Sequence, residues 1–196
     1  VTDGSQDVML FSSGGRAIRF GESAVRPMGR TARGVRGIHL GEGERVMSLI
    51  ICAEGDVLTA TEKGYGKRTP VAEYPRYGRG GKGVISIKTG ARNGAVVGAT
   101  LVTSGDEIMM ITDSGTLVRT PVEGISSMGR NTQGVKLIAL DEGQRLVGVE
   151  KLVSLGDGNG DDAADGENEG GHEDDYAAGD EREDGMEGGE EGPASE

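Results

Sequence analysis

A basic loop bracketed by glycines occurs three times in this chain, and its regular spacing constrains the fold more than any other feature. The copies are 29–35 (GRTARGV), 78–84 (GRGGKGV) and 129–135 (GRNTQGV). Their arginines, Arg30, Arg79 and Arg130, are separated by 49 and 51 residues. A period of this size is typical of architectures built from stacked or radial repeat units. Each loop leads straight into a valine, which predicts a basic loop displayed on a β-strand scaffold.

The same spacing extends through four short apolar segments in each repeat, and each segment predicts a β-strand. A first strand (8–11, 57–60 and 108–111) leads to a short turn ending in Gly15, Gly64 or Gly115. Glycine is suited to these turns because it readily takes a positive φ. A second strand returns through Arg19, Arg68 or Arg119. Pro70 and Pro121 mark the end of this strand in the later repeats, since proline cannot donate to a central ladder.

Two further strands complete each repeat. The third is expected at 35–40, 84–88 and 135–140, and the fourth at 46–51, 96–102 and 146–152. Four short strands in about 50 residues, with glycine turns between them, are typical of a propeller-like blade. The sequence therefore predicts an all-β domain over 1–153, with blades at about 7–55, 56–105 and 106–153. Three blades are too few to close a ring of the usual four to eight, so we expect further blades upstream.

The segment after the second strand carries apolar residues that we expect to anchor the blade. They are Val25, Tyr74 and Ile125 at one phase of the repeat and Met28, Tyr77 and Met128 at another.

Charge divides the chain into two parts. The whole chain has a net charge of −12, but residues 154–196 contain 17 acidic residues and one basic residue. Residues 1–153 then have a net charge of +4. Such asymmetry indicates nucleic-acid contact by one part and an acidic tail as the other. With few apolar residues to bury, the tail is predicted to be disordered. It could either compete with a polyanion for the basic loops or only keep the chain soluble.

Composition argues against several classes of function. One cysteine (Cys52) and two histidines (His39 and His172) cannot supply a disulfide, a metal set or a catalytic triad. Paired carboxylates are plentiful only in the tail, where no geometry is held for acid–base chemistry. No apolar run reaches the length of about 20 residues needed to span a bilayer. We expect a cytoplasmic, non-catalytic chain that contacts no membrane and holds no cofactor.

The second loop also matches the G-x-G-x-x-G dinucleotide pattern. That pattern binds a pyrophosphate only where it opens a helix, whereas a predicted strand follows here. A Walker A loop also fails, because Gly83 follows Lys82 where Ser or Thr is required. Two readings of the loops stay open. In the first, glycines let the backbone approach phosphates that Arg79 and Lys82 bind. In the second, the glycines serve turns and the repeated arginines pair between blades, which is the stronger reading for Arg19, Arg68 and Arg119.

Several longer strings resemble the C-terminal domain of the A subunit of bacterial DNA gyrase. They are 33–38 (RGVRGI), 59–69 (TATEKGYGKRT), 82–88 (KGVISIK) and 108–120 (IMMITDSGTLVRT), within a resemblance covering roughly residues 7–153. The resemblance implies a β-pinwheel, a propeller-like ring, usually of six blades, in which neighbouring blades exchange strands. It also implies non-sequence-specific DNA wrapping around a basic rim, in support of ATP-dependent negative supercoiling. The implied partners are double-stranded DNA and the remaining parts of an A2B2 gyrase complex, with ATP and Mg used elsewhere in that complex.

The resemblance has two limits. The signature box of the family, Gln-Arg-Arg-Gly-Gly-Lys/Arg-Gly, has no intact copy, because Tyr77 and Gly78 replace its leading Gln-Arg. The family's cleavage tyrosine lies in another region of the gyrase polypeptide, so no tyrosine here inherits that role. Two alternatives remain: the equivalent C-terminal domain of topoisomerase IV, and a propeller that grips an acidic protein. The predicted DNA-binding residues are Arg30, Arg33, Arg36, Lys63, Lys67, Arg68, Arg79, Lys82, Arg119 and Arg130.

Overall fold

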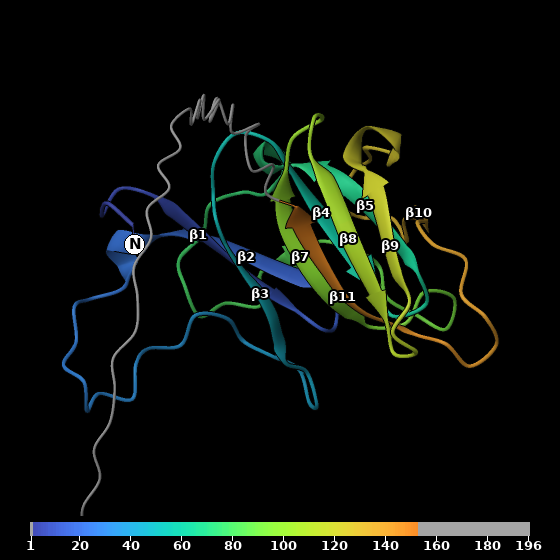
Figure 1. The fold of residues 1–196 in the computed structure, drawn as a ribbon. Helices are drawn as coiled ribbons and strands as arrows, with labels where there is room; N and C mark the ends of the chain where they lie inside the picture. Colours follow the sequence, from blue (N-terminus) through green and yellow to red (C-terminus); the bar gives the residue numbers. More distant parts are fainter. Residues whose placement is uncertain (1, 153–196) are drawn as a thin grey trace, which may run out of the picture. The chain divides into compact units, whose positions relative to one another are not determined.

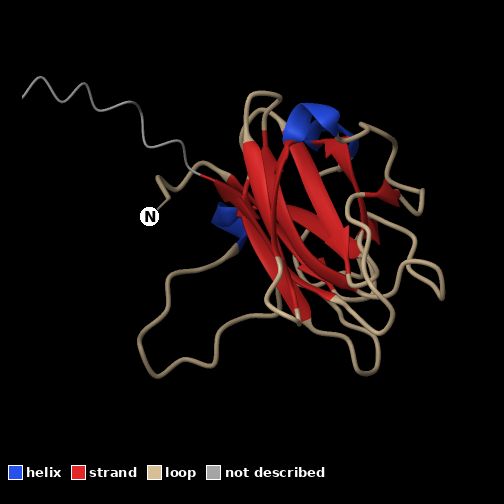
Figure 2. Cartoon of the chain, turned by 45° about the vertical axis from the view of Figure 1, so that its right-hand side comes forward, coloured by secondary structure: helices blue, strands red, loops and turns tan. Residues whose placement is uncertain are grey.

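The computed structural model describes residues 2–152, which form three antiparallel β-sheets side by side (Figures 1 and 2). The predicted acidic tail, 154–196, lies outside the described residues. The first-repeat elements are β1 (Asp7–Ser12), β2 (Arg16–Gly21), the 3-10 turn η1 (Glu22–Ala24) and β3 (Val46–Ile51). The second-repeat elements are β4 (Asp56–Thr61), β5 (Tyr65–Pro70), η2 (Val71–Glu73), β6 (Val84–Ile85) and β7 (Val96–Val102). The third-repeat elements are β8 (Glu107–Thr112), β9 (Leu117–Pro121), η3 (Val122–Gly124), β10 (Val135–Lys136) and β11 (Leu146–Leu152).

Each repeat begins with the predicted hairpin. The turns between β1 and β2, β4 and β5, and β8 and β9 each contain a glycine in the left-handed region, with φ of 83°, 77° and 87° at Gly15, Gly64 and Gly115. The fourth strand pairs with the first strand of its own repeat, and a register shift recurs near the end of that pairing in all three repeats. The all-β prediction is therefore confirmed, and β5 and β9 end at Pro70 and Pro121 as expected.

The third strand differs from the prediction in length and in partner. It is only two residues long in β6 and β10, and residues 35–40 form no strand. β6 pairs with β2 of the preceding repeat, and β10 pairs with β5, giving the sheet orders β3-β1-β2-β6 and β10-β5-β4-β7. This is the strand exchange that the family resemblance implies. Among the described residues no strand forms a ladder with 35–40. The backbone of this segment is bonded only at single points, where His39 donates to Gly81 and Gly80 donates to Gly37.

We call the sheets blades 1, 2 and 3 in chain order, and the contact zones between them the first and second seams. Backbone hydrogen bonds repeat from one seam to the next. The amide of Tyr77 donates to the carbonyl of Arg19 (2.8 Å), and one repeat later Met128 donates to Arg68 (2.9 Å). Bonds of this kind make each seam a continuation of the sheet ladder.

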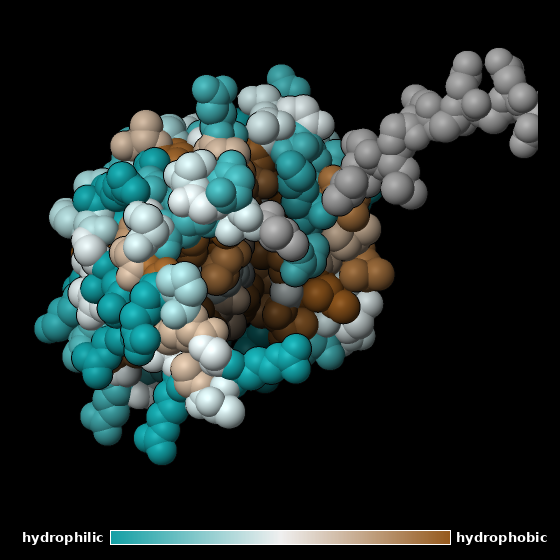
Figure 3. All heavy atoms as spheres, turned by 90° about the vertical axis from the view of Figure 1, so that its left-hand side faces the viewer, coloured by the Kyte–Doolittle hydropathy of each residue, from teal (hydrophilic) through white to brown (hydrophobic). Residues whose placement is uncertain are grey.

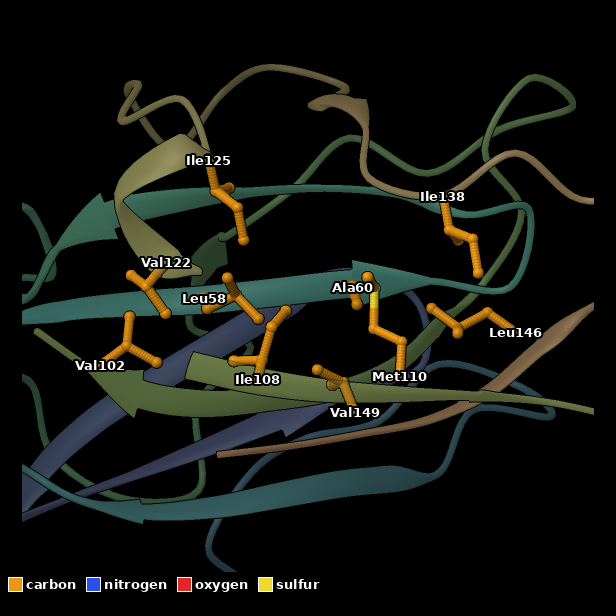
Figure 4. Packing of buried hydrophobic residues seen from close by; sticks show 10 residues of the cluster. All are labelled: Leu58, Ala60, Val102, Ile108, Met110, Val122, Ile125, Ile138, Leu146 and Val149. Carbon is orange, nitrogen blue, oxygen red and sulfur yellow. The ribbon is translucent and has the colours of Figure 1, made fainter. Parts of the chain in front are cut away.

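The hydrophobic core lies in the seams. In the second seam Leu58 and Ala60 of β4 pack against Ile108 and Met110 of β8, and η3 closes the cluster with Val122 (Figure 4). Each fully buried large apolar side chain of this kind contributes about 1.5–3 kcal/mol. The first seam has a matching cluster in which the rings of Tyr74 and Phe11 meet edge to face, with centroids 6.2 Å apart.

Only some of the predicted anchors are buried. Tyr74 and Ile125 are buried in the seams, as expected. Tyr77 was predicted wrongly, because its side chain is 51% exposed. Val25 was also predicted wrongly and is 39% exposed, at the rim of an apolar hollow of about 950 Å³ on blade 1. Figure 3 looks onto this side of the molecule and shows apolar surface gathered in a hollow among polar residues.

Candidate nucleic-acid interface

The sheet orders give the blades an inner and an outer edge. The fourth strands, β3, β7 and β11, lie beside one another and line a common hollow of about 600 Å³. The exchanged strands β6 and β10 lie at the opposite edge of their sheets. Because a glycine loop leads directly into each exchanged strand, the second and third loops are placed at the outer edge. For these two loops the topology agrees with the prediction of a basic loop displayed on a strand.

The loop glycines are required by close packing as well as by turn geometry. Gly83 and Gly134 both have a positive φ, of 63° and 78°. A Cβ on Gly83 would clash with the carbonyl oxygen of Ala17, and one on Gly134 would lie 2.6 Å from that of Gly66. Only glycine fits where a loop presses this closely on the preceding hairpin. Gly34 has the same positive φ, yet a Cβ there would meet nothing within 4 Å.

The repeated loop arginines bind the backbone of the preceding repeat. Arg79 donates from Nε to the carbonyl of Ala24 (2.9 Å) and from Nη1 to that of Arg36 (3.2 Å). Arg130 donates from Nη1 to the carbonyl of Ile85 (3.2 Å). The geometry supports the reading in which these arginines join blades. Arg79 nevertheless keeps an exposed side chain, and Arg130 is half-buried.

Two of the strand arginines also bind the backbone of a neighbouring repeat. Arg19 donates to the carbonyls of Val71 and Tyr74 (both 3.3 Å) and pairs with Asp7. Arg68 donates to the carbonyl of Ile125 (2.7 Å) and lies 3.8 Å from Asp56. The bonds to carbonyls cross a seam, whereas each ion pair lies within one hairpin. Arg68 therefore joins two blades and is largely shielded from solvent.

Arg119 stands at the same phase but crosses no seam. Its guanidinium pairs with Glu107 of the neighbouring strand β8, and its side chain is 62% exposed. Among the described residues no third seam exists for it to bridge, which explains why it differs from Arg19 and Arg68.

Lys67 was predicted as a DNA contact, and its burial contradicts that prediction. Its side chain is completely buried in the second seam, where Nζ donates to the carbonyls of Gly129 (2.5 Å) and Arg130 (2.7 Å). Burial lowers the pKa of the Lys67 amine to about 8, from an ordinary value of 10.5. The corresponding residues, Ile18 and Val118, are apolar, and that was the signal in the sequence that this position faces a neighbouring blade.

The remaining predicted residues are exposed. Arg30, Arg33, Arg36 and Lys82 have exposed side chains on the first and second glycine loops or on the segment that follows the first. None of these four side chains makes a hydrogen bond or ion pair with other described residues. Lys63 is exposed at the β4–β5 turn. Sequence reasoning passed over other exposed cations, among them Lys88, Arg92 and Lys136.

The described residues also bear on metal binding, cysteine reactivity and membrane insertion. They hold no cluster of three or more His, Cys, Asp or Glu residues able to bind a metal. Burial raises the pKa of the half-buried Cys52 thiol, which makes it a poor nucleophile. No helix in the described part of the chain is long and apolar enough to cross a membrane.

Comparison with known proteins agrees with this geometry. The family model described as "DNA gyrase C-terminal domain, beta-propeller" matches residues 6–53, 55–103 and 106–152. The DNA gyrase A protein of Pseudomonas aeruginosa is 54% identical over 168 residues, and that of Escherichia coli K12 is 56% identical over 167. Each match covers 85% of this chain but only 18% or 19% of the relative, so the chain spans about a fifth of their length.

Two solved structures resemble this fold. A DNA gyrase A C-terminal domain matches with a TM-score of 0.73 and 30% identity, over 78% of this chain and 52% of that one. A C-terminal domain of DNA topoisomerase IV matches with the same TM-score and 26% identity, over 77% and 48%. The repeats, the exchanged strands and the sequence identities together show that this chain belongs to the DNA gyrase C-terminal domain family.

Proposed function

We propose that this chain binds duplex DNA along its outer edge, without sequence preference, and bends it. The observation that carries the proposal is the placement of exposed, uncommitted cations on and beside the glycine loops. Phosphate contacts of this kind supply affinity and position but read no bases. Bending a short duplex costs on the order of several kcal/mol, so contacts spread along an edge are needed to offset it.

The proposed contacts differ from the full set of repeated basic residues. Arg30, Arg33, Arg36 and Lys82 are placed in our DNA-contacting group, because their exposed side chains bind no other described residue. Lys63 is added because it is exposed and its one bond, to the carbonyl of Ala91, leaves two of its three donors free. Arg68, Arg79, Arg119 and Arg130 are assigned to holding loops and strands in place, since each already binds a carbonyl or a carboxylate. The chain itself performs no catalytic step in this proposal.

The wider setting follows from the family. We infer that the chain works in the cytoplasm within a gyrase complex made of two A and two B subunits. In that setting DNA held at the outer edge supports ATP-dependent negative supercoiling, while ATP and Mg act elsewhere in the complex. The curated relatives named above are gyrase proteins, and this favours gyrase over topoisomerase IV as the parent enzyme.

The proposal is tested by DNA binding over a salt series, using the wild type and an Arg33→Glu/Lys82→Glu variant. About five phosphate contacts give a slope of log affinity against log salt of roughly −4 to −5. The variant is expected to bind more weakly, with a shallower slope. A wild-type slope near zero would refute DNA binding. Binding of an acidic protein that a duplex of unrelated sequence does not displace would identify a protein-binding propeller instead.

A further inference from the structure

A basic pocket of about 470 Å³ opens at the second seam, beside the exchanged strand β10. We call it the seam pocket and define it by the cations and the aromatic ring that line it. They are Lys63, Tyr65, Arg92, Lys136 and Arg145. Two of its cations come from turns of blade 2 and two from the third repeat, so the pocket exists only because the two repeats meet. Lys63 is the only member that also belongs to the DNA-binding residues predicted from the sequence.

Arg92 is held in place before any ligand arrives. The guanidinium of Arg92 lies over the ring of Tyr65, 4.9 Å from its centroid. Tyr65 in turn is paired with Lys136 in the β5–β10 ladder. Cation–π stacking restrains an arginine without using up its hydrogen-bond donors. The donors of Arg92 therefore stay available in the pocket that Lys136 also lines.

Lys63 is restrained in a similar way. Its backbone amide donates to the carbonyl of Asn93 (3.2 Å), and its Nζ donates to the carbonyl of Ala91 (2.5 Å). An ammonium has three donors, so two remain for a ligand. Asn93 itself is completely buried and donates from Nδ2 to the carbonyl of Lys88, which fixes the turn that carries Arg92.

The pocket has a surplus of positive charge. Two carboxylates, Glu62 and Asp141, also line it. Arg145 is already paired with Asp113, with Nε and Oδ2 3.4 Å apart. Lys63, Arg92 and Lys136 are thus three cations beside two carboxylates in one pocket, where an anion can accept charge-assisted hydrogen bonds.

The first seam lacks this arrangement, which shows that the pocket is more than a by-product of the repeat. The residues that correspond to Lys63, Tyr65 and Lys136 are Gly14, Arg16 and Ile85. Arg16 donates to the carbonyl of Gly83 (3.4 Å), so its guanidinium already has a partner within the protein. A basic, aromatic-backed pocket is therefore specific to the second seam.

We propose that the seam pocket binds backbone phosphates of duplex DNA and is a principal grip on the outer edge. Arg92 and Lys136 make the contacts and Tyr65 positions Arg92. This inference rests on the proposed function and adds a location to it: DNA is held more firmly where blades 2 and 3 meet than where blades 1 and 2 meet.

The test compares three double charge reversals in the full 196-residue chain, with a duplex of unrelated sequence as the probe. Arg92→Glu/Lys136→Glu removes the seam pocket. Arg26→Glu/Arg45→Glu is the matched control, because it makes the same change in net charge at two exposed arginines of the first repeat. Arg33→Glu/Lys82→Glu reports on the glycine loops. Thermal melting checks that each variant is folded, and Lys136→Gln provides a milder change at an exposed position.

The seam variant is expected to lose about tenfold to a hundredfold in affinity at about 0.1 M salt, with a slope less negative by about 2. The control should change far less, and Lys136→Gln should reduce the slope by about 1. A seam variant no weaker than the control would overturn the inference. If the loop variant is then still weakened, the proposed function stands. If no variant is weakened, the proposed function fails as well.

A second arm separates DNA from a small anion. Inorganic phosphate is titrated calorimetrically into the DNA-free wild type and the seam variant at matched ionic strength. No measurable heat from either protein is the expected result, since one free phosphate cannot use contacts spread along an edge. Tight phosphate binding that the seam variant loses would identify a small-anion site and overturn the assignment to DNA.

Discussion

Arg130 donates a hydrogen bond to the carbonyl oxygen of Ile85, and the two residues belong to different repeats. Arg79 makes the corresponding bond to Arg36, 49 residues before Ile85. The arginine of the glycine loop, the most regular feature of the sequence, is therefore part of the joint between repeats. This assignment divides the basic residues into those that hold blades together and those that face solvent.

Arg130→Ala is expected to destabilise the domain, because it removes the bond between the third glycine loop and the exchanged strand β6 and the packing of a half-buried side chain. A hydrogen bond from a charged donor contributes about 1.5–3 kcal/mol. Arg30→Ala is the matched control, since Arg30 has the same phase but an exposed side chain with no bond to other described residues. Urea denaturation measures both. Equal losses of stability in the two variants would contradict the assignment of Arg130 to the joint between repeats.

Arg68 and Arg119 offer a second matched pair. Arg68→Met removes the bond to the carbonyl of Ile125 in the second seam and should cost about 1–3 kcal/mol. Arg119→Met removes an exposed pair with Glu107 and should leave the free energy of unfolding almost unchanged. Denaturant midpoints of the two variants and of the wild type show which substitution causes the larger loss of stability. A larger loss from Arg119→Met would mean that the strand arginines do not act through the seam.

Two loop glycines allow the cost of backbone strain to be distinguished from the cost of a steric clash. Gly83→Ala and Gly34→Ala both place an alanine at positive φ, which costs on the order of 1 kcal/mol. Only at Gly83 does the new Cβ also meet the carbonyl of Ala17. Gly83→Ala should therefore lower the melting temperature clearly more than Gly34→Ala. Similar melting temperatures would contradict the close packing of the second loop on its preceding hairpin.

Lys67 should make the free energy of unfolding depend on pH, and the direction of this dependence follows from its pKa values. Its pKa is about 8 when folded and about 10.5 when unfolded, so between these values the unfolded chain binds more protons. Stability should then rise with pH from about 8 to 10.5 and be independent of this group below 8. The rise is at most about 3 kcal/mol.

Lys67→Ile tests this dependence, because it installs the residue that Ile18 supplies in the first repeat. The wild type should gain stability relative to this variant as the pH is raised through about 8 to 10.5, measured by denaturation at each pH. Lys63→Met controls for the loss of an exposed lysine. A constant difference between wild type and Lys67→Ile would show that the amine titrates near its ordinary pKa.

Much of the fold follows from patterns within one repeat. The hairpins and the fourth strands were predicted because turn glycines and apolar runs recur at a fixed phase, and local pairing satisfies their backbone. The third strand was predicted too long and without its partner. Residues 84–88 have the composition of a strand, but only the two residues that meet β2 of the preceding repeat form a ladder. Composition shows that a segment can pair and says nothing of which hairpin it meets.

The candidate site was predictable to a lesser degree. Repetition drew attention to the glycine loops. An arginine that recurs in every repeat, however, can join neighbouring repeats as readily as it can contact a ligand. Arg92 has no basic counterpart in the other repeats and was therefore missed, whereas Lys136 was missed although it has the same phase as Arg36. Their common location depends on strand exchange, which brings together a turn of one repeat and a strand of the next.

Strand exchange also determines how the domain carries a mechanical load. β6 and β10 are hydrogen-bonded to one blade while the chain on either side of them belongs to the next. A pull on either strand at the outer edge is therefore shared between two blades, one loaded through the ladder and the other through the covalent backbone. Detaching an edge strand requires a seam to open as well. A polymer bound at this edge, stiff enough to resist bending, would pull against pairs of blades rather than single ones.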